Sequence, residues 1–243
     1  MALQPERVPT GIVKLDEALH GGLLRGRTHL VAGETGTGKT IFALQFLVTG
    51  AKQFDEAGIY VMVDEEPEEL IRGARTLGWD LEELISMRKL SIMTLASDFV
   101  EKAREKEMDT VVRSIVRDIE LEARRIGATR LVLDPIAPLI PEEERRSKLR
   151  EYVRKLMMEL ERRVGCTIIA TSEVPTGSNA LSRYGVEEFL AAGVIVLKIE
   201  QTLHGYRRRM LVRKMRWTPI RPVEFDFDIV PGHGIVILGE SQA

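Results

Sequence analysis

Short apolar runs alternate, over the first two thirds of the chain, with stretches whose apolar residues recur at helical spacing. Buried strands are predicted over residues 28–33, 58–64, 90–95, 130–134 and 166–172. Helices are predicted over residues 39–54, 108–126 and 142–164, with Pro67 well placed to open a further one. This alternation of strands and helices is typical of a parallel α/β sheet covered by helices.

The pattern changes after Ser182, where helical periodicity disappears. Short β-rich runs separated by Gly and Pro follow, at residues 193–200, 207–215, 222–230 and 234–238. No linker-like stretch rich in Ser, Gly or Pro intervenes. We therefore predict an antiparallel extension of the same sheet, and a single domain over residues 1–243.

Composition excludes several classes of protein. A chain of 243 residues is long enough to bury a sizeable core without a metal or disulfide staple. Cys166 is the only cysteine, which excludes an intramolecular disulfide and favours a cytoplasmic protein. No signal-like leader or apolar stretch long enough to span a membrane is present, so no membrane association is expected. The net charge of −2 argues against a general polyanion binder.

A second compositional feature bears on the source. Asn and Gln together number 6, beside 25 Arg and 10 Lys. Proteins of thermophilic organisms often contain few thermolabile residues and many charged ones, so this composition favours a thermophilic source. A GC-rich genome that favours Arg over Lys would explain part of it.

Residues 33–40 read GETGTGKT, which matches the phosphate-binding spacing G-x-x-x-x-G-K-[S/T] at every fixed position. The glycines permit turns that aim backbone N–H groups at phosphate oxygens, and the following helix adds its N-terminal dipole. Lys39 can reach the β- and γ-phosphates, and the Thr40 hydroxyl can hold Mg²⁺. We predict a nucleotide site formed by Gly33, Glu34, Thr35, Gly36, Thr37, Gly38, Lys39, Thr40 and Ile41.

Acidic residues at the ends of other predicted strands complete this site. Asp134 ends an apolar run and is predicted to hold Mg²⁺ through water, with Asp64 as the rival. Hydrolysis also needs a carboxylate that orients or deprotonates water, and Asp64, Glu65 and Glu66 stand at a suitable strand end. These acids could equally form a solvated cap on the next helix. Glu173, beside Ser172, could sense the γ-phosphate or simply end its strand.

Four motifs in order resemble the RecA-superfamily ATPases of the KaiC-like group, which includes the clock protein and RadA-like proteins. Residues 7–47 look like the family's opening, and residues 58–81 resemble the stretch that carries its paired catalytic acids. Residues 183–197 and 214–216 resemble the late motifs. The resemblance implies a RecA-like P-loop core, with a mostly parallel twisted sheet flanked by helices and a C-terminal antiparallel β extension.

The same resemblance implies Mg²⁺-dependent ATP hydrolysis between neighbouring subunits of a homo-oligomer, usually a hexameric ring. It places the acid pair on Asp64 and Glu65, with Glu65 as the base. Lys214 and Arg216 match the basic residues that reach a neighbour's γ-phosphate. Two positions depart from the family: Trp217, where Gly is usual, and Pro135, where a hydroxyl residue is common. The expected role is a regulatory or signalling switch that acts on a protein partner not yet identified.

A recombination or repair ATPase of the RadA-like type is the alternative. The loops that would face the ring axis, residues 136–148 and 173–183, contain no aromatic side chain for base stacking. Strong single-stranded DNA binding is therefore disfavoured. Weak duplex contact through the arginines at 207–209 stays open, as does their pairing along solvated strand faces.

An autokinase is a third possibility, because the clock proteins phosphorylate themselves. Where their kinase domain has a Ser-Thr pair, this chain has Glu187 and Glu188, which cannot accept phosphate. The pair could also be an ordinary surface feature. The chain matches one such domain where the clock proteins carry two, so circadian timing is not expected.

Overall fold

The computed structural model describes residues 5–63, 65–95, 108–140, 145–175, 177, 180–203 and 205–241. Nine strands form one sheet in the order β11-β10-β9-β8-β3-β7-β6-β4-β5. Six of them come from the parallel part: β3 (Thr28–Gly33), β4 (Ala57–Val63), β5 (Leu90–Leu95), β6 (Ala128–Asp134), β7 (Thr167–Glu173) and β8 (Gly193–Thr202). The antiparallel part comprises β9 (Gly205–Met215), β10 (Val223–Val230) and β11 (Gly234–Glu240). The predicted fold class is confirmed.

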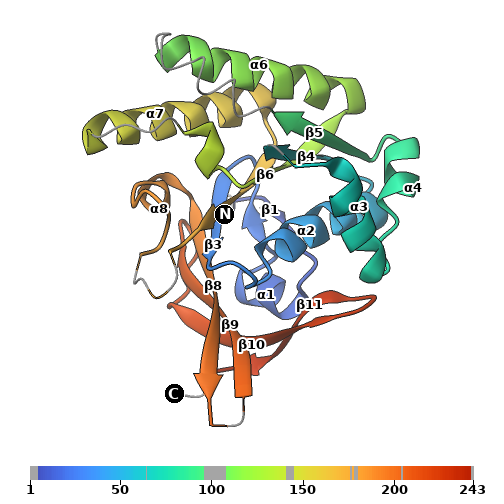
Figure 1. Cartoon of the computed structure of the whole chain (residues 1–243), viewed down its shortest axis with the longest axis vertical. Helices are drawn as coiled ribbons and strands as arrows, with labels where there is room; N and C mark the ends of the chain where they lie inside the picture. Colours follow the sequence, from blue (N-terminus) through green and yellow to red (C-terminus); the bar gives the residue numbers. More distant parts are fainter. Residues whose placement is uncertain are drawn as a thin grey trace.

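Helices cover both faces of the sheet (Figure 1). One face is packed by α6 (Met108–Ile126) and α7 (Arg146–Glu159), which a π-helical turn (Leu160–Val164) continues. The other carries α1 (Val13–Ala18), α2 (Lys39–Gln53), α3 (Pro67–Thr76) and α4 (Leu81–Ser86). A short pair, β1 (Arg7–Val8) and β2 (Leu23–Leu24), a 3₁₀ turn (Ala137–Leu139) and α8 (Glu187–Leu190) complete the described elements.

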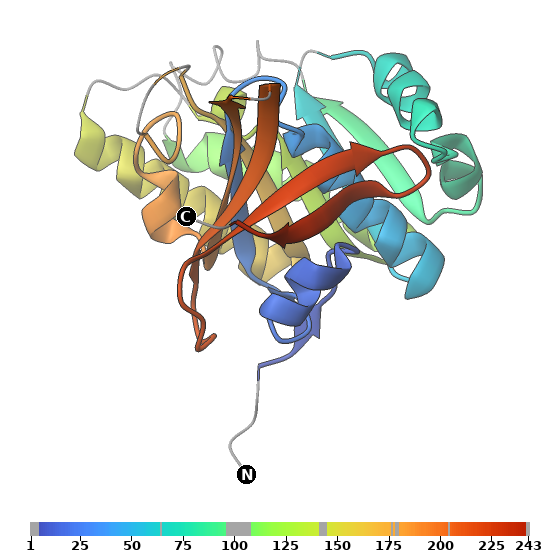
Figure 2. The same ribbon diagram turned by 90° about the horizontal axis from the view of Figure 1, so that it is seen from below.

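One predicted pairing differs from the structure. The first of the four late strands, β8, pairs in parallel with β3, so the antiparallel extension begins only at β9. The β8–β9 hairpin then runs out beyond the helices, and β10 and β11 fold back toward α2 (Figures 1 and 2). The late strands therefore reach the same edge of the sheet as the phosphate-binding loop.

Arg130 is a fully buried cation that holds the N-terminal segment against the sheet. Its guanidinium donates to the carbonyls of Pro9 and Phe46, both at 2.8 Å, and pairs with Glu56 at 2.7 Å. It also lies 4.5 Å from the centre of the Phe46 ring. Because a buried ion pair leaves an uncompensated charge when one partner is removed, we expect this residue to matter for stability.

Arg130→Met is therefore expected to lower the free energy of unfolding by about 3 kcal/mol. The carbonyls of Pro9 and Phe46 would lose a donor, and Glu56 would lose a partner. Urea unfolding measures this change. Arg124→Met, which removes an exposed arginine paired with Glu120, should change it by less than about 0.5 kcal/mol. Equal effects of the two substitutions would contradict the structural role of Arg130.

Candidate functional site

The phosphate-binding loop joins β3 to α2 at the carboxyl edge of the sheet. Gly33 cannot carry a side chain, because a Cβ there would lie 2.4 Å from the carbonyl oxygen of Leu197 on β8. Gly38 adopts a left-handed backbone (φ 105°) and caps α2, whose first N–H groups have no intrahelical partner. These groups face the loop and suit an anion.

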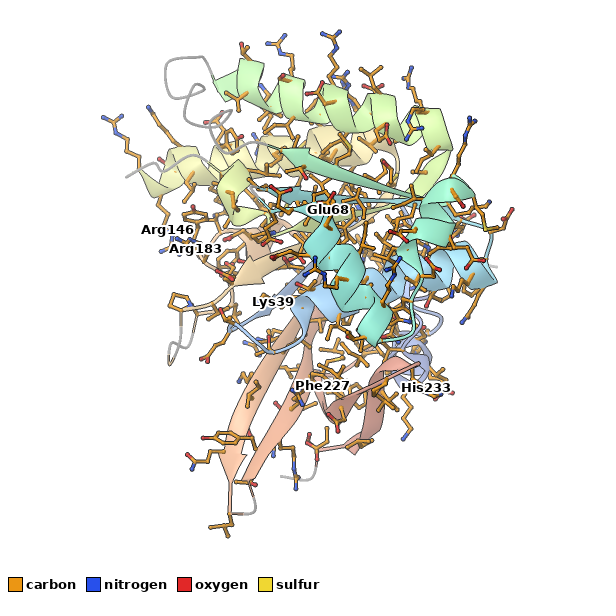
Figure 3. All side chains as sticks on the ribbon, turned by 45° about the vertical axis from the view of Figure 1, so that its right-hand side comes forward. Lys39, Glu68, Arg146, Arg183, Phe227 and His233 are labelled. Carbon is orange, nitrogen blue, oxygen red and sulfur yellow. The ribbon has the colours of Figure 1, made fainter. Side chains whose placement is uncertain are left out.

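Lys39 begins α2 and is largely buried beneath the loop (Figure 3). Its ammonium donates to the carbonyls of Gly33 at 3.0 Å and Glu34 at 2.9 Å. Burial lowers the pKa of Lys39, while the negative charges of Glu173 and Asp134 raise it. The ammonium is thus desolvated and points into the loop, where a phosphate group would be its strongest partner.

A cavity of about 420 Å³ opens beside this loop. The described residues that line it include eight of those predicted from the sequence: Thr35, Gly36, Gly38, Lys39, Thr40, Ile41, Glu65 and Asp134. Four others were not predicted as binding residues or were left open, namely Pro135, Glu173, Arg208 and Ile229. The loop and the strand-end carboxylates therefore share one cavity.

Asp134 ends β6 inside this cavity, and three hydroxyl groups hold its carboxylate. Thr40 donates to it at 2.8 Å, and Tyr60 and Thr171 donate to it from β4 and β7. Burial, followed by the charge of Asp134, raises the pKa of Tyr60 well above its usual value, so its phenol stays a donor. A carboxylate beside the Thr40 hydroxyl is a hard oxygen pair of the kind that Mg²⁺ prefers.

Glu65 lies just before α3 and faces the cavity from the β4 side. Burial raises its pKa, and the negative charges of Asp134, Glu69 and Glu173 raise it further. A carboxylate with a raised pKa is a better proton acceptor than an ordinary glutamate. Asp64, the other half of the predicted acid pair, lies outside the described residues.

Three predicted loop residues do not line this cavity. Thr37 is buried and its hydroxyl donates to the Glu34 carbonyl at 2.8 Å, which braces the loop. Gly33 and Glu34 line a second cavity of about 230 Å³, whose other walls are β8 and the segment after β7. The Glu34 carboxylate also accepts the N–H of Gly177 at 2.9 Å, so it ties the loop to the segment after β7.

Lys214 and Arg216 lie on the far side of β8 from the phosphate-binding loop and are not among the residues that line the cavity. Lys214 donates to the carbonyl of Glu188, and Arg216 to that of Phe189, each at 2.9 Å. Burial lowers the pKa of Lys214, and the neighbouring charge of Arg216 lowers it further. The structure therefore brings these two cations together, but away from the phosphate-binding loop.

Trp217 has a left-handed backbone (φ 54°) and 80% of its surface is exposed. A left-handed conformation costs a bulky residue about 1–2 kcal/mol. Trp217→Gly should therefore raise the free energy of unfolding by about 0.5–1 kcal/mol, net of the greater freedom of unfolded Gly. Trp217→Ala removes the ring and keeps the strain, so chemical denaturation should show no such gain. Equal gains would mean that the ring, not the backbone, is unfavourable.

Ile229 reaches the cavity because β10 passes close to the start of α2, and Arg208 reaches it from the adjacent strand β9. The side chain of Ile229 lies 3.2 Å from the position a Cβ on Gly38 would take. Arg208 pairs with Asp228 at 3.2 Å on the adjacent strand. An apolar and a cationic side chain at this rim form a surface on which a planar base could stack.

Comparison with known proteins identifies the family. A sequence profile of the family described as "ATPase: KaiC" matches residues 8–242. The circadian clock oscillator protein KaiC of Thermostichus vulcanus is 36% identical over 239 residues, which are 98% of this chain and 45% of that protein. KaiC of Synechococcus elongatus is 34% identical over 233 residues, 95% of this chain and 44% of its own. This chain thus spans about half the length of these relatives.

A solved structure is similar over nearly its whole length. The crystal structure of a KaiC-like protein from the hyperthermophilic archaeon Pyrococcus horikoshii OT3 superposes with a TM-score of 0.78 and 38% sequence identity. The match covers 96% of this chain and 99% of that one. The motifs, the fold and these similarities agree, and the chain belongs to the KaiC-like ATPase family of the RecA superfamily.

Proposed function

We propose that this protein binds and hydrolyses Mg²⁺-ATP in the cavity beside the phosphate-binding loop. The proposal rests on the cavity lining: Lys39 and Thr40 at the start of α2, Glu65 before α3 and Asp134 at the end of β6 come from three separate segments and line one cavity. Membership of an ATPase family implies nucleotide binding. The desolvated ammonium of Lys39 and the free N–H groups of α2 suit the phosphates, and Arg208 and Ile229 suit the base.

We propose that the Thr40 hydroxyl and the Asp134 carboxylate, which lie 2.8 Å apart, would hold Mg²⁺. When bound, the ion would neutralise charge that develops on the phosphate oxygens. Tyr60 and Thr171 would keep the Asp134 carboxylate in one orientation. Glu65 would accept the proton of the attacking water, for which its raised pKa suits it.

We further propose that the site is completed by a second copy of the chain in a homo-oligomeric ring, which the resemblance to the family suggests is hexameric. Lys214 and Arg216 are held away from their own cavity, so they are available to a neighbour's γ-phosphate. The acidic residues Glu65, Glu66, Glu68 and Glu69 border the cavity and the start of α3, which complements this basic pair. Such a ring would act as a regulatory switch on a protein partner in the cytoplasm.

The arginines at 207–209 do not support the DNA-linked alternative. Arg207 pairs with Asp226 at 3.0 Å, and Arg209 pairs with Glu224 at 2.7 Å. Arg208 pairs with Asp228 and lines the cavity. Because carboxylates of β10 and β8 match their charge, these residues offer little to a phosphate backbone. None of the described helices is long and apolar enough to cross a membrane.

Turnover of γ-labelled ATP tests the proposal when released phosphate and labelled protein are followed together, with and without Mg²⁺. Free phosphate that depends on Mg²⁺, with unlabelled protein, is the expected result. Label on the protein would instead support the autokinase. Strong stimulation by single-stranded DNA would support the recombination alternative, and a monomer mass by light scattering with Mg²⁺-ATP would contradict the ring.

A further inference from the structure

A second polar cluster surrounds the four-residue helix α8, whose place in the fold is labelled in Figure 1. At its centre Glu187 is fully buried, so it is not part of a surface pair. The carboxylate accepts the Ser182 hydroxyl at 2.7 Å and the Val186 N–H at 3.1 Å. The Ser172 hydroxyl and the Tyr184 N–H lie at 3.4 Å. A buried carboxylate is tolerated only with such a set of donors.

This cluster fixes the start of α8 to the end of β7. Ser172 is the residue before Glu173, which lines the cavity, and its hydroxyl also accepts the N–H of Arg183 at 3.0 Å. Ser182 donates to Glu188 as well as to Glu187. A helix as short as α8 is not stable on its own. These side-chain hydrogen bonds therefore hold α8 and the segment before it in place.

The other end of α8 carries the basic pair. The carbonyls of Glu188 and Phe189 accept the side chains of Lys214 and Arg216, and the Ala192 carbonyl accepts the backbone N–H of Arg216 at 2.8 Å. The last carbonyls of a helix have no intrahelical partner, so cations are favourable there. A displacement of α8 would therefore move both cations.

We propose that Glu187 is a positioning residue, whose buried carboxylate holds α8 and thereby aims Lys214 and Arg216 at the nucleotide of a neighbouring subunit. The inference rests on the proposed function, because it needs these cations to act in trans. It assigns Glu187 no contact with its own nucleotide. Loss of its negative charge should therefore impair the neighbour's site and leave its own site intact.

Glu187→Gln is expected to slow turnover by about tenfold, because small misplacements of catalytic groups cost one to two orders of magnitude. Binding of a fluorescent ATP analogue to the subunit's own site should stay within about twofold, since the cavity is unchanged. Ser182→Ala, which removes one donor and keeps the carboxylate, should show a smaller loss in the same direction. Glu151→Gln, on the exposed face of α7, is the matched control and should have no effect.

Mixed assemblies separate this role from a merely structural one. Glu187→Gln subunits and Lys39→Ala subunits are produced together with two different tags and purified on both. Lys39→Ala subunits cannot use their own cavity but still present Lys214 and Arg216. Turnover should therefore rise clearly above the mean of the two parent proteins. A mean or lower value would show that Glu187 acts on its own site and would overturn the inference.

A parallel mixture tests the proposed function separately. Subunits with Lys214→Ala and Arg216→Ala are combined with Lys39→Ala subunits in the same way. If turnover rises above the parental mean in this mixture but not in the mixture with Glu187→Gln, only the proposed role of Glu187 is overturned. If turnover does not rise in this mixture, Lys214 and Arg216 do not act on a neighbouring subunit. The role proposed for Glu187 is then overturned as well. Adding Glu187→Gln to the Lys214→Ala, Arg216→Ala protein should cost nothing further, whereas an independent loss would again contradict it.

Discussion

Replacing Lys39 by alanine is expected to abolish ATP turnover, with a loss of at least about 10²-fold, the effect typical of removing one preorganised electrostatic donor. The Lys39 ammonium is largely buried and held by the carbonyls of Gly33 and Glu34. Burial has already removed part of the water around this ammonium, which lowers its pKa. Binding a phosphate therefore costs the ammonium little further hydration. Without the ammonium, negative charge on the β- and γ-phosphates would face the carboxylates of Asp134 and Glu173 uncompensated.

Equilibrium binding of a fluorescent ATP analogue and single-turnover hydrolysis measure the effect of Lys39→Ala. Lys52→Ala is the matched control, because Lys52 is an exposed lysine in the last turn of the same helix. It should leave binding and turnover unchanged. Near-normal turnover in Lys39→Ala, in a protein with an unchanged melting temperature, would place the nucleotide elsewhere.

The bounds of several strands and helices could be predicted from local patterns in the sequence. Strands β3 and β5 and helix α6 have the predicted bounds, because each is a continuous periodic run between residues that break it. The helix predicted over residues 142–164 is α7 from Arg146 with its π-helical turn, and residues 141–144 lie outside the described part. Two-residue strands such as β1, and helices of less than two turns such as α4 and α8, are too short to show a recognisable pattern. That residues 1–243 form a single domain stays a prediction.

Some residues of the site can be predicted from the local sequence, and others cannot. The loop motif and the strand-end position of Asp134 are local features, and they predicted most of the cavity wall. Tyr60 and Thr171 hold Asp134 through the register of β4, β6 and β7, and nothing in the sequence near Asp134 points to them. Arg208 and Ile229 reach the cavity only because β10 passes close to the start of α2 with β9 paired beside it. Such residues depend on tertiary pairing.

The partners and the burial of charged residues also depend on tertiary structure and could not be predicted from the sequence. Arginines 207–209 form a basic run in the sequence, but their partners are carboxylates on strands that precede and follow them. Cys166 is a buried core residue, as its apolar surroundings suggest. Glu187 is fully buried, although a Glu-Glu pair beside a turn is usually exposed. A sequence states the charge of a side chain, whereas its environment depends on the assembled fold.

Glu65→Gln is expected to bind ATP normally and to hydrolyse it at least tenfold more slowly, since a general base commonly contributes about 10²–10⁴. The amide keeps the shape of Glu65 at the cavity wall but cannot accept the proton of water. Single-turnover hydrolysis with saturating Mg²⁺-ATP isolates this step. Glu83→Gln, which changes an exposed glutamate in the first turn of α4, is the matched control and should turn over normally.

The dependence of kcat/KM on pH supplies a second measurement of the same role. The base must be deprotonated, so activity should rise as pH increases through the pKa of Glu65. Burial and the charges of Asp134, Glu69 and Glu173 raise that pKa, so the acid limb should lie at higher pH than for an ordinary glutamate. Glu65→Gln should lose this limb. Unchanged turnover and an unchanged limb would assign the base to another carboxylate, and Glu66→Gln would be the next variant to measure.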